Sequence, residues 1–147
     1  MELTEITQEI FDTLLVIDGF KQCPTGDYSE IKKFPNSCYF GNNCKFGNDC
    51  EFGIRCRFDD HCNFGNNCAF DENCRFFDGC KFGEHCTFKG SYFDDWCEFD
   101  VCCKFRSDCE FGRNCSFWFD CTFGAGCSFQ EDCEFRDGCS FDSDLKI

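Results

Sequence analysis

A six-residue repeat occupies most of this chain and limits what it can fold into. From residue 38 to residue 141 the units read Cys-x-Phe, then Gly or Asp, then two polar residues, as in CYFGNN at 38–43. The phase breaks once, at 89–93, where a unit is one residue short, and residues 145–147 (LKI) keep the phase with aliphatic side chains. A short period held this long predicts a solenoid, in which each unit packs on its neighbours.

Within each unit, Cys and Phe are two residues apart, so both point to one side of an extended strand. All units run in the same direction, so they cannot pair as hairpins and we expect them to coil. Three units make one turn, which places rings such as Phe40, Phe58 and Phe76 in one column and Phe46 and Phe64 in another. The pattern predicts an all-β solenoid of about six coils, with Phe rings and thiols inside.

The unit Phe-Gly-Asn-Asn-Cys-Lys at 40–45 resembles the repeat of the hexapeptide-repeat family, with Phe for its aliphatic residue and Cys for its small residue. The resemblance covers the chain from 38 to 147 and implies that family's left-handed, triangular parallel β-helix. Pentapeptide-repeat proteins, which form a right-handed quadrilateral helix, also use Cys-x-Phe. Their period of five fits this chain less well, so we rank that alternative lower.

The chain divides into three regions. Residues 1–22 are expected to form an N-terminal capping helix, which Thr4 or Thr7 can begin and Asp18-Gly19 can end. Its apolar residues at helical spacing are Leu3, Ile6, Ile10, Leu14 and Ile17. A β-helix has open ends, and we expect this helix to close the first coil. Residues 23–37 read as an irregular first coil, and residues 38–147 as the hexapeptide-repeat β-helix with its one-residue deletion at 89–93.

The cysteines are interpreted as packing residues. The chain has 19 of them, an odd number, and nearly all occupy the inward slot of the repeat. Free Cys behaves as a small, usually buried hydrophobe, and the acidic N-terminus does not resemble a signal peptide. We therefore expect reduced thiols and a cytoplasmic location, in a bacterial or phage-infected cell. Cys23 and Cys102 lie off the pattern, so they are the thiols expected to react.

The charge excludes one class of ligand. The formal net charge is −14, whereas phosphate binding needs clustered Lys and Arg, so we expect no direct contact with nucleic acid. The acidity is uneven, with a net charge of −2 over residues 38–90 and −9 over residues 91–144. Such a surface could resemble nucleic acid to another protein. No apolar run is long enough to span a membrane.

Catalytic chemistry is mostly missing from the sequence. The resemblance to hexapeptide-repeat acyltransferases implies a catalytic His near a loop that leaves the coil, but His61 and His85 both sit in uninterrupted corners. The Cys-x5-Cys spacing does not match zinc sites. The pairs Asp59-Asp60 and Asp94-Asp95 read as turn residues. We expect no enzyme activity, cofactor or metal.

Several corners depart from the polar pattern and predict an interface. Phe77 and Trp96 fall on one corner in neighbouring coils, and Val101 and Cys102 fall on the next corner, one coil before Trp118-Phe119. Exposed Trp and Tyr in an apolar patch typically mark interfaces; alternatively, these side chains fold back over the corners. The interface candidates are Tyr39, Phe77, Tyr92, Asp94, Asp95, Trp96, Glu98, Val101, Trp118, Phe119 and Glu134.

These observations predict a non-catalytic, acidic interaction protein that forms a homodimer and binds another protein. One specific form follows by analogy with DNA-mimicking pentapeptide-repeat proteins. In that form the chain inhibits a nucleic-acid enzyme or a bacterial defence complex, as a phage anti-defence protein would. The alternatives are a hexapeptide-repeat acyltransferase-like enzyme and a structural rod.

Overall fold

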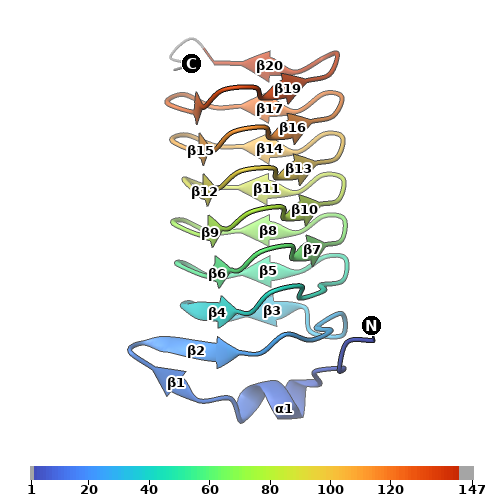
Figure 1. Ribbon diagram of the computed structural model, residues 1–147, viewed down its shortest axis with the longest axis vertical. Helices are drawn as coiled ribbons and strands as arrows, with labels where there is room; N and C mark the ends of the chain where they lie inside the picture. Colours follow the sequence, from blue (N-terminus) through green and yellow to red (C-terminus); the bar gives the residue numbers. More distant parts are fainter. Residues whose placement is uncertain (1, 143–147) are drawn as a thin grey trace.

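Each Cys-x-Phe unit forms one short strand, and the residues after Phe turn the chain into the next strand. In the computed structural model, which describes residues 2–142, this produces an all-β parallel solenoid (Figure 1). The turn depends on the last residue of each unit, which has a left-handed backbone, with φ from +57° at Asn114 to +64° at Trp96 in the repeats where it is not Gly. Asn, Asp and Gly tolerate that conformation best, which explains their frequency at the corners.

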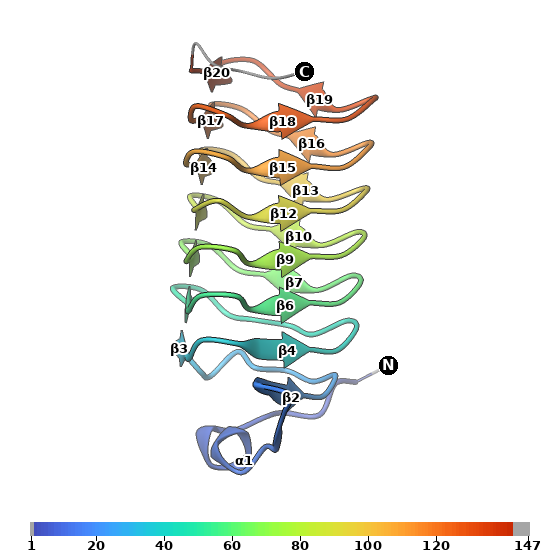
Figure 2. The same ribbon diagram turned by 90° about the vertical axis from the view of Figure 1, so that its left-hand side faces the viewer.

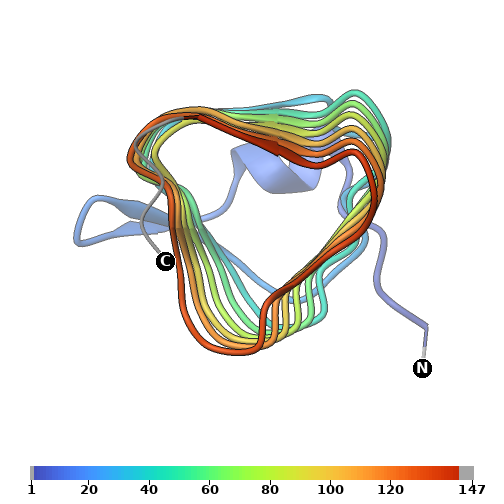
Figure 3. The same ribbon diagram turned by 90° about the horizontal axis from the view of Figure 1, so that it is seen from above.

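Three sheets surround a common interior (Figure 3). The eight-stranded sheet contains β1 (Val16–Ile17), β2 (Phe20–Cys23), β4 (Cys38–Phe40), β6 (Arg57–Phe58), β9 (Arg75–Phe76), β12 (Tyr92–Phe93), β15 (Glu110–Phe111) and β18 (Ser128–Phe129). The five-stranded sheet contains β7 (Asn63–Phe64), β10 (Lys81–Phe82), β13 (Glu98–Phe99), β16 (Ser116–Phe117) and β19 (Glu134–Phe135). The seven-stranded sheet contains β3 (Lys33–Phe34), β5 (Glu51–Phe52), β8 (Ala69–Phe70), β11 (Thr87–Phe88), β14 (Lys104–Phe105), β17 (Thr122–Phe123) and β20 (Ser140–Phe141).

The solenoid has about seven turns, one more than the repeat predicts. Figure 2 shows the strands of successive turns lying above one another. The additional turn comes from residues 20–37, since β2 pairs in parallel with β4 and β3 pairs with β5. Single bridges from Glu5 to Asp27 and from Asp27 to Lys45 extend the third side. The irregular first coil is therefore already part of the stack, although its sequence does not follow the repeat.

The one-residue deletion is absorbed without breaking the coil. Tyr39 pairs with Arg57, and Arg57 with Arg75, at the same separation in sequence. Arg75 pairs with Tyr92, which is one residue closer in sequence than that separation. Gly90, at φ +42°, lies in the tightened corner, and the fully buried Ser91 takes the Cys slot. The Ser91 hydroxyl donates to the carbonyl of Lys89. The shorter corner therefore leaves the inside unchanged.

The core consists of Phe columns and thiols, as the repeat predicts. Phe58 stacks on Phe76 of the next turn with ring centroids 4.8 Å apart and planes 4° apart. Phe58 also meets Phe64 of the neighbouring column edge-to-face, at 4.9 Å. All 19 cysteines are free, and 16 of them are buried. In the regular turns nearly all buried thiols donate to a corner carbonyl of the preceding turn, as Cys86 does to Gly65 at 3.4 Å.

The N-terminal region differs from the single long helix that we expected. Helix α1 spans only Gln8–Asp12, with Thr7 as its N-cap. Val16 and Ile17 instead pair antiparallel with Lys21 and Phe20. Asp18 and Gly19, at φ +52° and +85°, form the two-residue turn that favours a hairpin with this twist. Asp-Gly is a strong hairpin signal, so the interpretation of this dipeptide as a helix end was wrong. The terminal LKI, 145–147, lies outside the described residues.

Candidate protein-interaction surface

Trp96 occupies a backbone position that disfavours it. Its φ is +64°, in the left-handed region where a bulky residue is an outlier that costs about 1–2 kcal/mol. The same slot holds Asn43 and Asn114 in other turns of this corner. The Trp96 side chain gains little burial in return, since it is 62% exposed. Strained positions of this kind are concentrated at functional sites, which makes Trp96 the centre of the candidate surface.

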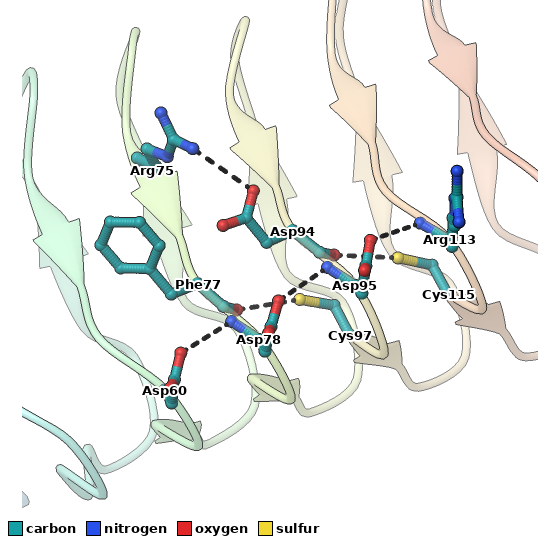
Figure 4. A network of polar contacts seen from close by, with 9 residues as sticks. All are labelled: Asp60, Arg75, Phe77, Asp78, Asp94, Asp95, Cys97, Arg113 and Cys115. Atoms are coloured by element: carbon teal, nitrogen blue, oxygen red, sulfur yellow. Dashed lines mark hydrogen bonds and ion pairs between the residues drawn. The ribbon is translucent and has the colours of Figure 1, made fainter.

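A ladder of aspartates runs along the corner that carries Trp96 (Figure 4). Asp60 accepts a hydrogen bond from the backbone N–H of Asp78, and Asp78 accepts one from the N–H of Asp95, both at 3.1 Å. Asp95 in turn accepts the N–H of Arg113 at 2.8 Å. These carboxylates hold successive turns in register, and their order places a line of negative charge beside Trp96.

Asp94 and Phe77 occupy equivalent places in adjacent turns of this corner. The Arg75 guanidinium lies 3.5 Å from an Asp94 carboxylate oxygen and 5.1 Å from the centre of the Phe77 ring. Burial raises the pKa of Asp94, Arg75 lowers it, and the nearby carboxylates of Asp78 and Asp95 raise it, which leaves the pKa above its usual value. Phe77 is half-buried beneath Arg75, so it contributes less free surface than Trp96.

The second aromatic corner carries Trp118 and Phe119. They are 43% and 41% exposed, and their rings meet edge-to-face at 6.1 Å. The Arg136 guanidinium lies over Trp118 at 5.0 Å. Val101, in the preceding turn, is half-buried. The sequence left open whether these side chains are exposed or fold back over the corners. Trp118 and Phe119 are partly covered and do not fold fully back.

The five-stranded sheet forms the face between the two aromatic corners. Its register aligns Lys81 with Glu98, Glu98 with Ser116 and Ser116 with Glu134. Lys81 and Glu98 form an exposed ion pair at 3.4 Å. Trp96 and Trp118 therefore flank a face whose outward column becomes acidic toward the C-terminal end. The structure brings these predicted residues together.

Tyr39 and Tyr92 lie on the adjacent eight-stranded sheet, apart from that face. Tyr39 is half-buried, whereas Tyr92 is 43% exposed. Tyr92 borders two open depressions of about 500 and 460 Å³, one beside Lys89 and Gly90 and the other beside Asp94 and Asp95. The sequence reasoning missed these depressions. The one-residue deletion was the available signal, since the first depression lies at the tightened corner.

The off-pattern thiols differ in exposure. Cys102 is half-buried at φ +60°, and its backbone N–H donates to Phe119 in the next turn. Cys23 is only 3% exposed, so burial gives no support to its predicted reactivity. Cys133 and Cys139 are partly exposed in the last described turn. Their position in the repeat predicts burial, but no further turn within residues 2–142 covers them.

The histidines are corner residues. His61 and His85 have φ values of +60° and +59° and are exposed. The His61 imidazole lies where a Cβ on Gly79 would be placed, in the same slot of the next turn. Neither histidine borders the depressions beside Tyr92. Among residues 2–142, no group of three or more His, Cys, Asp or Glu side chains is arranged to hold a metal ion.

In the part of the chain that the structure describes, no helix has the length and apolar content needed to cross a bilayer. Comparisons with protein-family models, curated proteins and solved structures return no match to this chain.

Proposed function

We propose that this solenoid is a non-catalytic interaction protein that binds a protein partner through the face between Trp96 and Trp118. The observation that carries the proposal is Trp96, a large aromatic side chain that is 62% exposed in a left-handed corner position. Selection for stability alone would favour Asn there. Trp is also a preferred hot-spot residue.

The charge around this face indicates the chemistry of the partner. The second half of the repeats carries a net charge of −9, and the Asp60–Asp78–Asp95 ladder lies along the corner of Trp96. A partner with Lys and Arg around an apolar centre would complement this surface. Cationic side chains can also bind the exposed indoles, as Arg136 does over Trp118 within this chain.

A nucleic-acid-binding protein is the partner class that best fits this chemistry. Carboxylates on adjacent turns repeat at roughly 4.8 Å, the separation of neighbouring strands, whereas each strand of duplex DNA carries a charge about every 3.4 Å. The ladder is sparser than a DNA strand but has the same linear arrangement. We therefore propose inhibition by nucleic-acid mimicry, against a nucleic-acid enzyme or bacterial defence complex.

The remaining parts of the proposal concern the setting and the finer shape. Nineteen free thiols favour a reducing cytoplasm, bacterial or phage-infected, and the aromatic face suits a homodimer as well as a foreign partner. The three sheets favour the left-handed triangular coil that the hexapeptide resemblance implies. Phe11, which is buried edge-to-face against Phe34 at 5.5 Å, favours a capping role for the N-terminal segment.

Affinity capture from a bacterial lysate tests the function, using the wild-type chain and a Trp96→Asn, Trp118→Gln double variant. Asn114 fills the Trp96 slot one turn later, and Gln130 fills the same position of the repeat as Trp118, at the neighbouring corner, so the fold should persist. We expect the wild type to retain a nucleic-acid-binding protein that duplex DNA or high salt releases, and the double variant to lose it.

The control is His61→Asn, which changes the Trp96 slot two turns earlier without removing an aromatic residue. Equal capture by wild type and double variant would refute the aromatic face as the binding surface. Retention of a partner that duplex DNA does not displace would refute mimicry. Saturable binding of acetyl-coenzyme A with no protein partner would favour the acyltransferase alternative.

A further inference from the structure

A second exposed apolar region lies at the N-terminal end, away from the aromatic corners. Leu15, Val16 and Ile17 are 72%, 63% and 53% exposed. They belong to the β1–β2 hairpin, which projects outside the outline of the coil when viewed along its axis (Figure 3). Neighbouring side chains of a strand point to opposite faces, so β1 is apolar on both faces.

Strand β1 is also a free edge of the eight-stranded sheet, because β2 is the only strand within residues 2–142 that pairs with it. The Leu15 carbonyl accepts the N–H of Gln22 at 2.8 Å. Val16 and Lys21, the next pair toward the turn, are therefore a non-hydrogen-bonded pair of the hairpin. In an antiparallel ladder, the N–H and C=O groups of a non-hydrogen-bonded pair point away from the strand that they face across the pair. The N–H of Lys21 accordingly donates outward, to Ser37. The N–H and C=O of Val16 therefore face the open edge.

Natural proteins protect such edges with Lys, Pro, bulges or covering segments. Strand β1 contains only Val and Ile, both of which favour strand pairing. The tip of the hairpin is only the two-residue turn Asp18-Gly19, and Val16 and Ile17 remain exposed. The edge combines free backbone hydrogen-bonding groups with apolar side chains, which are the two features that β-strand addition uses.

The charge around the edge indicates what kind of strand it accepts. Asp12 and Asp18 flank β1 in the chain, and residues 12–20 contain no Lys or Arg. Glu5 lies on another side of the coil, where it bridges to Asp27. Two cations near the hairpin are already engaged. The Lys21 Nζ donates to the Phe11 carbonyl at 2.8 Å and lies 4.6 Å from the centre of the Phe11 ring, and the Arg57 guanidinium lies 4.7 Å from the centre of the Phe20 ring. Two copies of this segment would bring like charges together. A strand from another protein that carries Lys or Arg beside apolar residues would be attracted.

We propose that β1 is a docking edge for an extended, basic and apolar segment of another protein, which adds to the eight-stranded sheet beside Val16. This site is separate from the Trp96–Trp118 face and does not depend on the function proposed for that face. Backbone hydrogen bonds to Val16 would set the register, and Asp12 and Asp18, together with the net charge of −14, would select for basic side chains.

The test uses the end-blocked peptide Lys-Val-Lys-Val-Lys-Val-Lys as the probe and isotope-labelled full-length chain. We expect saturable shifts of the backbone amide resonances of Val16, Ile17 and Asp18. The same peptide with Pro at its central Val keeps the charge but loses strand pairing, and a Glu-Val version reverses the charge. Both should bind at least tenfold more weakly.

Two chain variants separate backbone docking from general charge attraction. Val16→Pro removes the outward N–H and fixes φ at residue 16, a change tolerated on edge strands, and should weaken binding at least tenfold. Val16→Thr keeps that donor and should bind within about threefold of wild type.

Equal binding to Val16→Pro, or shifts that map to the acidic repeats instead of β1, would overturn the proposal. Wild-type dimers that Val16→Pro dissociates in sedimentation would assign the edge to a second copy instead. If Val16→Pro fails to fold, the wild-type shift map decides.

Discussion

At the scale of single residues, the sixth position of the repeat reveals the conflict between stability and function. The slot requires a left-handed backbone, and Asn fills it at positions 43, 67, 73 and 114. Asn is suited to it because its short polar side chain can hydrogen-bond locally. Arg55, Trp96 and Cys102 occupy the same slot without that advantage. Of these, only Trp96 is a large apolar side chain that also stays exposed, and that combination points to a role other than folding.

Replacing Trp96 with Asn should therefore stabilise the chain. We expect the free energy of unfolding to rise by about 1 kcal/mol, since the left-handed penalty of a bulky residue is removed. Urea denaturation of wild type and variant measures the difference. The reverse change one turn later, Asn114→Trp, should lower the free energy of unfolding by a similar amount. If Trp96→Asn is clearly destabilising, the indole packs favourably and its exposure is not a sign of function.

At the scale of single elements, each corner is built by contacts with the corner below it. Gly79, Gly126 and Gly138 all have positive φ, and a Cβ on each would overlap a side chain of the preceding turn: His61, Asp108 or Asp120. The corner side chains therefore lie over the same slot of the next turn. A residue in one coil limits which residues can occupy the coil above it.

Two glycine substitutions can separate backbone strain from this steric limit. Gly79→Ala combines φ +71° with overlap of the His61 imidazole, whereas Gly19→Ala has φ +85° and open space around the added Cβ. Both should lose about 1–2 kcal/mol of unfolding free energy from backbone strain, and Gly79→Ala should lose a further ~1–3 kcal/mol. Thermal or urea denaturation compares them. A His61→Ser background should remove the excess, and equal losses for both variants would contradict the overlap.

At the scale of the whole molecule, stability depends on thiols that must remain neutral. The neighbouring Cys62 thiol and burial raise the pKa of Cys44 well above its usual value, and Cys127 and burial do the same to the pKa of Cys109. Because the Cys44 thiol also donates to the carbonyl of Gly41 at 3.2 Å, the folded chain needs its proton. A neighbouring thiol and burial raise the pKa of the buried Cys74 and Cys103 as well, so this requirement recurs along the core.

We therefore predict cooperative unfolding in alkali. The folded-state pKa lies above the unfolded value of about 8.5, so the contribution is fully present below that pH and is lost as pH rises. Each thiol that ionises only on unfolding lowers the free energy of unfolding by about 1.4 kcal/mol per pH unit. Denaturation at pH 7–10.5 under reducing conditions measures the slope. Cys44→Ala removes one such thiol and should make the slope shallower by that single-thiol amount, and constant stability from pH 8 to 10 would contradict the prediction.

The repeat by itself determined the solenoid, the columns of Phe40, Phe46 and their equivalents, and the alignment of Trp96, Glu98 and Trp118 around one face. These follow from local periodicity, because each unit places its side chains by the same geometry as the last. Tertiary structure alone decided the regions without a repeat. There the packing of Phe11 against Phe34 and the turn at Asp18-Gly19 shortened the expected helix and exposed β1. Without a period, helical spacing and hairpin signals compete, and contacts with the first coil determine which prevails.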